Sequence, residues 1–137
     1  MTTEPTRAKV RNYRDLMWQK ALILAVEACQ LARALPASER YVLKDQVFRA
    51  SVSVPANIAE GQGRLSKGDC ARHLGIARGS LLELETLLHV ATAVGHLTEE
   101  KCAVARELAD EIGRMLWPMM NNLGARRFKP RTLTSHP

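Results

Sequence analysis

Residues 66–95 read SKGDCARHLGIARGSLLELETLLHVATAVG, and this stretch decides the fold class. Its apolar residues recur three and four positions apart without interruption: Leu74, Ala77, Leu81, Leu84, Leu88 and Ala91. That spacing places them on one face of an α-helix. Ser66 is a preferred N-cap residue, and Gly95 is typical of the position after the last turn. The sequence therefore predicts an amphipathic helix over residues 66–94.

Three further segments have the same periodicity, and each is bounded by a helix breaker or cap. The first holds Ala21, Ala25, Ala28, Ala32 and Leu35; the second Leu43, Val47, Ala50, Val54 and Ile58; the third Ala105, Leu108, Ile112, Met115 and Met119. We expect helices at residues 15–35, 39–61 and 98–123, the last capped by Thr98. Four such helices with short connections favour an all-α, antiparallel up-down-up-down four-helix bundle.

The composition agrees with a single helical domain. Of the 137 residues, 46% are hydrophobic but only 4% aromatic, so the core must be built from Leu, Ala, Val, Ile and Met. No apolar run approaches the ~18 residues that a membrane span needs. The first ten residues contain no apolar stretch of the kind found in secretory signals. We therefore expect a cytoplasmic protein with no membrane contact.

The net charge of +6 is concentrated at the two ends of the chain. Residues 1–14 carry +3, residues 125–137 carry +4, and residues 15–124 carry −1. We accordingly divide the chain into a basic N-terminal arm (1–14), a bundle (15–124) and a basic C-terminal tail (125–137). The cations of the arms are Arg7, Lys9, Arg11, Arg14, Arg126, Arg127, Lys129 and Arg131. Such arms are suited to phosphate backbones, although solvated tails that only aid solubility would have the same composition.

The sequence contains no recognised pattern for a metal, cofactor or catalytic site. A di-iron bundle needs Glu and His three apart, whereas Glu85 and His89 are four apart. The glycine segment that ends at Gly68 continues with Asp69 instead of the lysine of a phosphate-binding loop. No nucleophile elbow or triad order occurs. We predict no catalytic residue, metal or cofactor, although Arg64 and Lys67 could still meet a phosphate.

Polar residues follow one side of the predicted second and third helices. They are Gln46, Arg49, Ser53, Asn57 and Glu60 on the second helix, and Ser80 and Glu83 on the third. Glu85 belongs to another polar side of the third helix. Facing an interior, they would have to pair with one another, because a lone buried charge is very costly. We expect Arg49 to pair with Glu83 or Glu85, and Asn57 and Ser80 to bond neighbouring groups and fix the helix register. A ligand site built from the same residues is the alternative.

The first helix carries more apolar surface than one neighbouring helix requires. Leu22, Val26 and Cys29 form a second stripe, and Leu24 and Leu31 lie on another side. A monomer would leave such stripes exposed. The sequence therefore predicts self-association.

Several segments together resemble a known family. They are Tyr13–Leu16 (YRDL), Trp18–Ala21 (WQKA), Glu39–Tyr41 (ERY), Arg49–Gly61 (RASVSVPANIAEG) and Ala77–Thr86 (ARGSLLELET). Over residues 13–123 the chain is similar to the four-helix-bundle proteins encoded by intervening sequences of bacterial 23S ribosomal RNA genes. Accessory variability proteins of diversity-generating retroelements are related members. Two small departures are Val42, where the family often has Gly, and Leu87, where a polar residue is frequent.

The resemblance implies a ring-shaped homo-oligomer of five bundles, a role in binding nucleic acid, and no enzymatic activity. In the retroelement members it also implies a reverse transcriptase as partner. Two functions compete: a scaffold that binds RNA or DNA through the basic arms, and a structural or protein-interaction module without a nucleic-acid partner. Aromatic residues are scarce, and most of them are expected to pack. Binding should therefore be backbone-directed, weakly sequence-specific and salt-dependent.

Overall fold

The computed structural model of the protein describes residues 12–123, which form four long α-helices. They are α1 (Tyr13–Arg33), α2 (Asp45–Gln62), α3 (Lys67–Ala93) and α4 (Glu99–Asn122). No strand occurs among these residues. The predicted all-α class is confirmed, and both ends of α1, α3 and α4 lie within two residues of the expected positions.

Side-chain caps define where three of the helices begin. The side chain of Asn12 accepts a hydrogen bond from the Asp15 amide at 3.0 Å. Ser66 Oγ accepts one from the Asp69 amide at 3.0 Å, and Thr98 Oγ1 one from the Lys101 amide at 3.2 Å. The caps at Ser66 and Thr98 were predicted from sequence. Each satisfies a backbone N–H that has no partner within the helix.

The start of α2 differs from the prediction of one helix over residues 39–61. A 3₁₀ turn (Ala37–Glu39) and a π turn (Arg40–Lys44) precede α2. Leu43 in the π turn and Val47 in α2 are both buried. Their spacing of four is compatible with either kind of turn, so periodicity alone could not separate the π turn from the helix.

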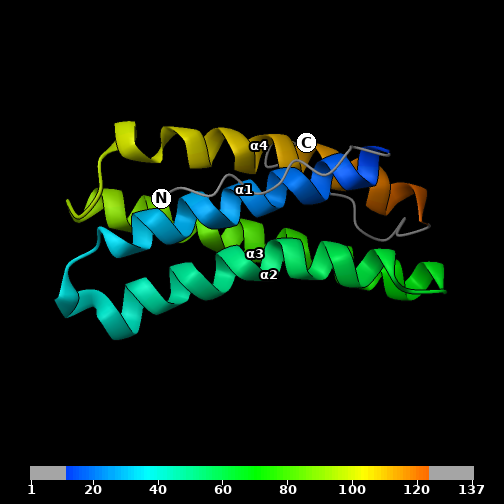
Figure 1. Cartoon of the computed structure of the whole chain (residues 1–137), viewed down its shortest axis with the longest axis horizontal. Coiled ribbons are helices and arrows are strands. Elements are labelled where there is room, and N and C mark those ends of the chain that lie inside the picture. Colours follow the sequence, from blue (N-terminus) through cyan, green and yellow to red (C-terminus); the bar gives the residue numbers. More distant parts are fainter. Residues whose placement is uncertain (1–11, 124–137) are drawn as a thin grey trace, which may run out of the picture.

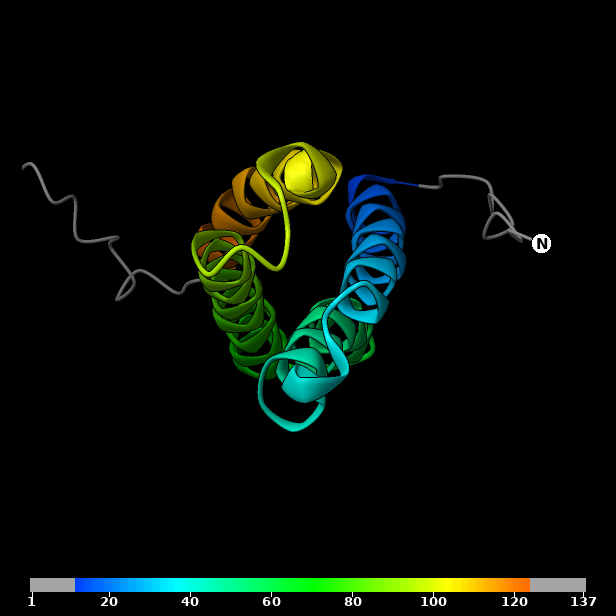
Figure 2. The same cartoon turned by 90° about the vertical axis from the view of Figure 1, so that its left-hand side faces the viewer.

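The four helices surround a common core (Figure 2). α1 packs against α2 and α4, and α3 packs against the same two helices. The connections between consecutive helices lie at alternating ends of the molecule (Figure 1). The α2–α3 contact is the most extensive of the four and the α3–α4 contact the least. An ion pair between Lys20 and Glu111 joins α1 to α4.

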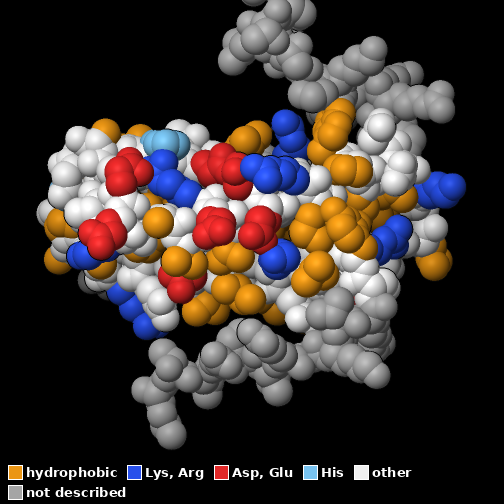
Figure 3. Space-filling view, turned by 90° about the horizontal axis from the view of Figure 1, so that it is seen from above, with side chains coloured by type: hydrophobic (Ala, Val, Ile, Leu, Met, Phe, Trp, Pro, Cys, Tyr) orange, Lys and Arg blue, Asp and Glu red, His pale blue; other side chains and the backbone are white. Residues whose placement is uncertain are grey.

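The core consists of the aliphatic side chains and methionines that the composition required. Ala21 and Ala28 of α1 are fully buried, which lets the helices approach closely. Leu24 and Leu31 also belong to this core, although the sequence suggested a separate stripe. Seen from above, α4 presents acidic and basic side chains side by side, and hydrophobic side chains gather towards the end where α4 finishes (Figure 3).

Candidate functional site

The seam between α2 and α3 contains a chain of hydrogen bonds. Ser53 Oγ lies 2.7 Å from Ser80 Oγ. Asn57 Nδ2 donates to the carbonyl oxygen of Ser53 at 2.9 Å and to its Oγ at 3.0 Å. Asn57 Oδ1 lies 3.2 Å from His73 Nδ1, so it accepts from a protonated Nδ1. The prediction that Asn57 and Ser80 bond neighbouring groups is confirmed.

The charged members of the predicted polar set lie outside this chain. The prediction that Arg49 pairs with Glu83 or Glu85 is wrong. Nε and Nη2 of Arg49 donate to Oδ2 of Asp45, one turn earlier on α2, at 3.2 and 2.9 Å. The Arg49 side chain is 77% exposed. A carboxylate on the same helix satisfies the guanidinium without removing it from water, whereas an interior pair would require desolvation.

The two glutamates that flank the seam are also at the surface. Glu60 accepts from Arg64 Nη2 at 2.9 Å. Glu83 is exposed, and its carboxylate has no ion pair with any described residue. Neither carboxylate is buried with Arg49, so the predicted interior cluster is reduced to its neutral members.

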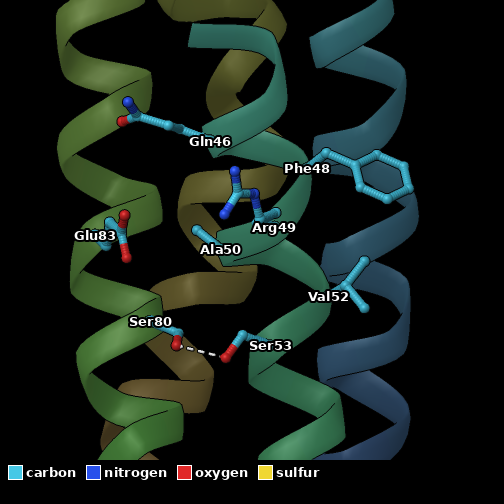
Figure 4. Close-up of a pocket in the computed structure, with 8 residues that line it drawn as sticks. All are labelled: Gln46, Phe48, Arg49, Ala50, Val52, Ser53, Ser80 and Glu83. Carbon is cyan, nitrogen blue, oxygen red and sulfur yellow. Dashed lines mark hydrogen bonds between the residues drawn. The ribbon is translucent and has the colours of Figure 1, made fainter. Parts of the chain in front are cut away.

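A hollow of about 680 Å³ opens between α2 and α3 (Figure 4). Gln46 and Arg49 extend into it from α2, and Glu83 lies opposite on α3. The bonded hydroxyls of Ser53 and Ser80 line its deeper part. Because these hydroxyls bond each other and Asp45 holds Arg49, the described contacts account for the seam as a structural feature.

The seam between α3 and α4 is charged. Nη1 of Arg106 lies 3.0 Å from Nδ1 of His89, and Nη2 lies 3.4 Å from Oε1 of Glu99. The Nε atom of Arg106 is buried without a hydrogen-bond partner. Burial raises the pKa of the nearby Glu85 carboxyl; Asp110 raises it further, while His89 and Arg106 oppose the shift. Arg106 and Glu85 in this seam are half-buried, and their surroundings compensate their charges only in part.

The two ends of the described chain meet at one hollow of about 610 Å³. Asn12, Tyr13 and Arg14 line it from the start of α1, and Asn122 and Leu123 line it from the end of α4. Both basic arms are therefore joined to the bundle at the same place. Of the eight predicted nucleic-acid contacts, only Arg14 is described, and it is exposed. Arg7, Lys9, Arg11, Arg126, Arg127, Lys129 and Arg131 lie outside the described residues.

The cations around this end differ in whether they have partners. Arg64 pairs with Glu60, and Arg72 Nε lies 3.9 Å from Asp69. Lys67, which lines the same hollow as Arg14, is exposed. Neither Arg14 nor Lys67 forms an ion pair with another residue of the described range. Of the two cations that the sequence offered for a phosphate, Lys67 is the one left unpaired.

An apolar face runs along the outside of α1 and α2. It consists of the half-buried Leu22 and Cys29 and the exposed Val26 of α1 with the exposed Phe48 and Val52 of α2. Cys29 Sγ lies 3.8 Å from Ser51 Oγ, which places this side of α1 against α2. Phe48 and Val52 point towards α1 (Figure 4). Val26 is 47% exposed and Phe48 53%.

Neither a metal cluster nor a membrane span is found in the described part of the chain. Residues 12–123 contain no group of three or more His, Cys, Asp or Glu side chains arranged to hold an ion. None of the helices α1–α4 combines the length and apolar character needed to cross a bilayer.

Comparison with known proteins identifies the family. A family model described as 23S rRNA-intervening sequence protein matches residues 14–117. The chain belongs to this family. The fold is shared with a crystal structure from Bacteroides thetaiotaomicron VPI-5482, described as a protein with unknown function from the S23 ribosomal protein family. That similarity covers 80% of this chain and 99% of the other, with a TM-score of 0.74 and 24% sequence identity. No curated protein matches the sequence.

Three residues of this family member were missed or misjudged from sequence. His73 is buried and completes the α2–α3 chain, but it was not included in the polar set predicted for this seam. Arg106 spans the α3–α4 seam, and its position in the predicted fourth helix gave no sign of that. Tyr13 is 50% exposed, whereas most of the aromatic residues were expected to pack. Its place at the very start of a helix was the available signal.

Proposed function

We propose that the protein is a non-enzymatic, oligomeric scaffold that binds the backbone of RNA or DNA through its two basic arms. The observation that carries the proposal is that Asn12 and Leu123 line one hollow. A net charge of +7, carried by residues 1–14 and 125–137, is thereby joined to one end of the bundle. Lys67 adds a further unpaired cation at that end, beside Arg14. Cations grouped in this way attract a polyanion more strongly than the same cations scattered over a surface.

Self-association would multiply this charge. The apolar face of α1 and α2 supports an interface between copies, because exposed apolar side chains grouped on neighbouring helices commonly mark an interaction site. The alternating connections of Figure 1 support an antiparallel up-down-up-down bundle as the repeating unit. A closed ring uses one heterologous interface repeatedly. We propose a homopentamer, the number that the family resemblance implies. Sedimentation that gives a monomer mass at micromolar concentration would contradict it.

The binding proposal is tested by filter binding of a structured RNA and of duplex DNA at low and moderate salt. One variant replaces the eight arm cations by Gln: Arg7, Lys9, Arg11, Arg14, Arg126, Arg127, Lys129 and Arg131. A matched control replaces four exposed cations of the bundle by Gln: Arg33, Arg49, Lys101 and Arg114. We expect the arm variant to lose most of its affinity and its salt dependence, since each phosphate contact contributes roughly one unit to the log–log salt slope.

The control variant should retain the salt slope of the parent protein. Absence of binding to either nucleic acid at low salt, or equal binding by the arm variant, would refute the arm-mediated scaffold.

A structural or protein-interaction module is the second candidate. The half-exposed Phe48 and Val26 of the apolar face favour it, since they suit a protein partner as well as a further copy. A reverse transcriptase is one such partner that the family resemblance suggests. Co-purification of a protein partner that is lost in Phe48→Ser, combined with no affinity for nucleic acid, would favour this candidate.

A further inference from the structure

We propose that the hollow where both chain ends meet binds one unpaired nucleotide of a single strand, with the base against Tyr13 and the phosphate against Arg14 and Lys67. The inference rests on the proposed nucleic-acid function and goes beyond it. Arms that contact only the backbone would bind a strand with bases and an abasic strand equally well. The hollow measures about 610 Å³. Ligand sites commonly measure roughly 300–1,000 Å³, so a mononucleotide unit is of suitable size.

Tyr13 provides an aromatic surface at the mouth of the hollow. Its side chain is 50% exposed, and its phenol has no hydrogen bond within residues 12–123. Trp18 and Trp117, by contrast, are half-buried in the bundle. Met119 and Pro118 line the same hollow and add apolar surface beside the ring. A flat ring next to apolar walls is a stacking platform that every base can use.

Arg14 and Lys67 provide the charge that a phosphate needs. They come from different helices, α1 and α3, and line the hollow together with Tyr13. The Gln62 side chain donates a hydrogen bond of 3.1 Å to the carbonyl oxygen of Arg14. This bond ties the start of α1 to the end of α2, and so fixes the position from which Arg14 extends. Both cations lack an acidic partner in the described part of the chain, so no ion pair has to break when a phosphate binds.

Two amides complete a set of groups that suits a nucleotide. The Asn12 side-chain oxygen caps α1, which leaves its NH₂ group free to donate. Asn122 lines the hollow from the end of α4, is exposed and has no hydrogen bond to a described residue. Carboxamides can bond the edge of a base with both donor and acceptor atoms. The α2–α3 hollow also holds one carboxamide, Gln46, but its cation, Arg49, is already paired with Asp45.

The test compares a short fluorescent single-stranded RNA with an abasic strand of the same length and charge, using anisotropy on the full-length protein. We expect the parent protein to prefer the strand with bases by about 5- to 150-fold, the range that corresponds to stacking of one base. Tyr13→Ala should remove this preference, and Tyr13→Phe should retain it. Phe48→Ala, which changes an exposed aromatic on the apolar face, should leave it unchanged.

Lys67→Gln should weaken the binding of both strands by a similar factor. It should also lower the slope of log affinity against log salt concentration by about one unit, as expected for a phosphate contact. Circular dichroism checks that each variant folds. Equal affinity of the parent protein for the two strands, or a preference that survives Tyr13→Ala, would overturn the nucleotide site while leaving arm-mediated binding intact. Failure to bind either strand at low salt would overturn the proposed function as well.

Discussion

The α2–α3 seam and the hollow at the chain ends both gather polar side chains, but they use them differently. In the seam, Ser53, Asn57, Ser80 and His73 bond one another. In the hollow, Arg14 and Lys67 are exposed and have no acidic partner among the described residues. Polar groups that satisfy each other stabilise a unique packing, whereas exposed groups without partners cost little and remain available to a ligand. The seam therefore contributes to stability, and the hollow is the place where we propose that a ligand binds.

The largest effect on stability is expected from Asn57→Ala. The substitution leaves the Nδ1 hydrogen of the buried His73 without its acceptor, which costs about 1–3 kcal/mol of unfolding free energy. Urea denaturation measures it. Asn122→Ala is the matched control, because Asn122 lies in the hollow, is exposed and has no hydrogen bond within the described range. Similar unfolding free energies for the two variants would contradict the structural role of the seam.

A pair of glycines tests how closely α2 and α3 approach. A Cβ atom on Gly61 would lie 3.2 Å from the Cys70 carbonyl oxygen and 3.3 Å from the His73 Cβ. Gly61→Ala should therefore push the helices apart and cost roughly 1 kcal/mol or more. A Cβ on Gly79 would meet nothing within 4 Å. Gly79→Ala should stabilise the protein by about 0.5–1 kcal/mol, because alanine loses less backbone entropy in a helix. A similarly lowered melting temperature in both variants would refute the close approach of α2 and α3 at Gly61.

Sequence reasoning predicted the helices well because their apolar spacing has few alternatives. It failed where one spacing of apolar residues fits two backbone conformations, as at the π turn before α2. It also failed for Arg49, whose position beside the core face fits an interior pair as well as a surface pair with Asp45. The predicted up-down-up-down order already places the start of the first helix and the end of the fourth at one end of the bundle. Which side chains line the hollow there could not be predicted, since that depends on the lengths and packing of all four helices.

Glu85 in the α3–α4 seam should make the protein less stable as the pH rises. Its pKa is raised in the folded protein above the ordinary value of 4.5, chiefly by burial. Its contribution to stability is therefore fully present below about pH 4.5 and lost as the pH rises through the folded pKa. Relative to Glu85→Gln, the parent protein should lose stability across this window. Melting temperatures of both proteins between pH 4 and 8 measure the difference, and a parallel pair of curves would contradict it.

The smallest effect is expected from Arg49→Ala. An exposed pair one turn apart on a helix contributes about 0.3–0.5 kcal/mol, so the melting temperature should hardly change. The same substitution in 1 M salt should have even less effect, because salt screens exposed charges. A loss of unfolding free energy comparable to that of Asn57→Ala would show that Arg49 belongs to the α2–α3 seam.

The most direct test of the account is to locate bound nucleic acid by crosslinking. A single-stranded RNA carrying photoreactive bases is irradiated on the full-length protein, and the crosslinked peptides are identified by mass spectrometry. The account predicts crosslinks in the peptides that contain Tyr13, Lys67 and Met119, which line the hollow at the chain ends. Crosslinks concentrated at Phe48 and Val52 of the apolar face, or at Gln46 and Glu83 of the α2–α3 hollow, would contradict it.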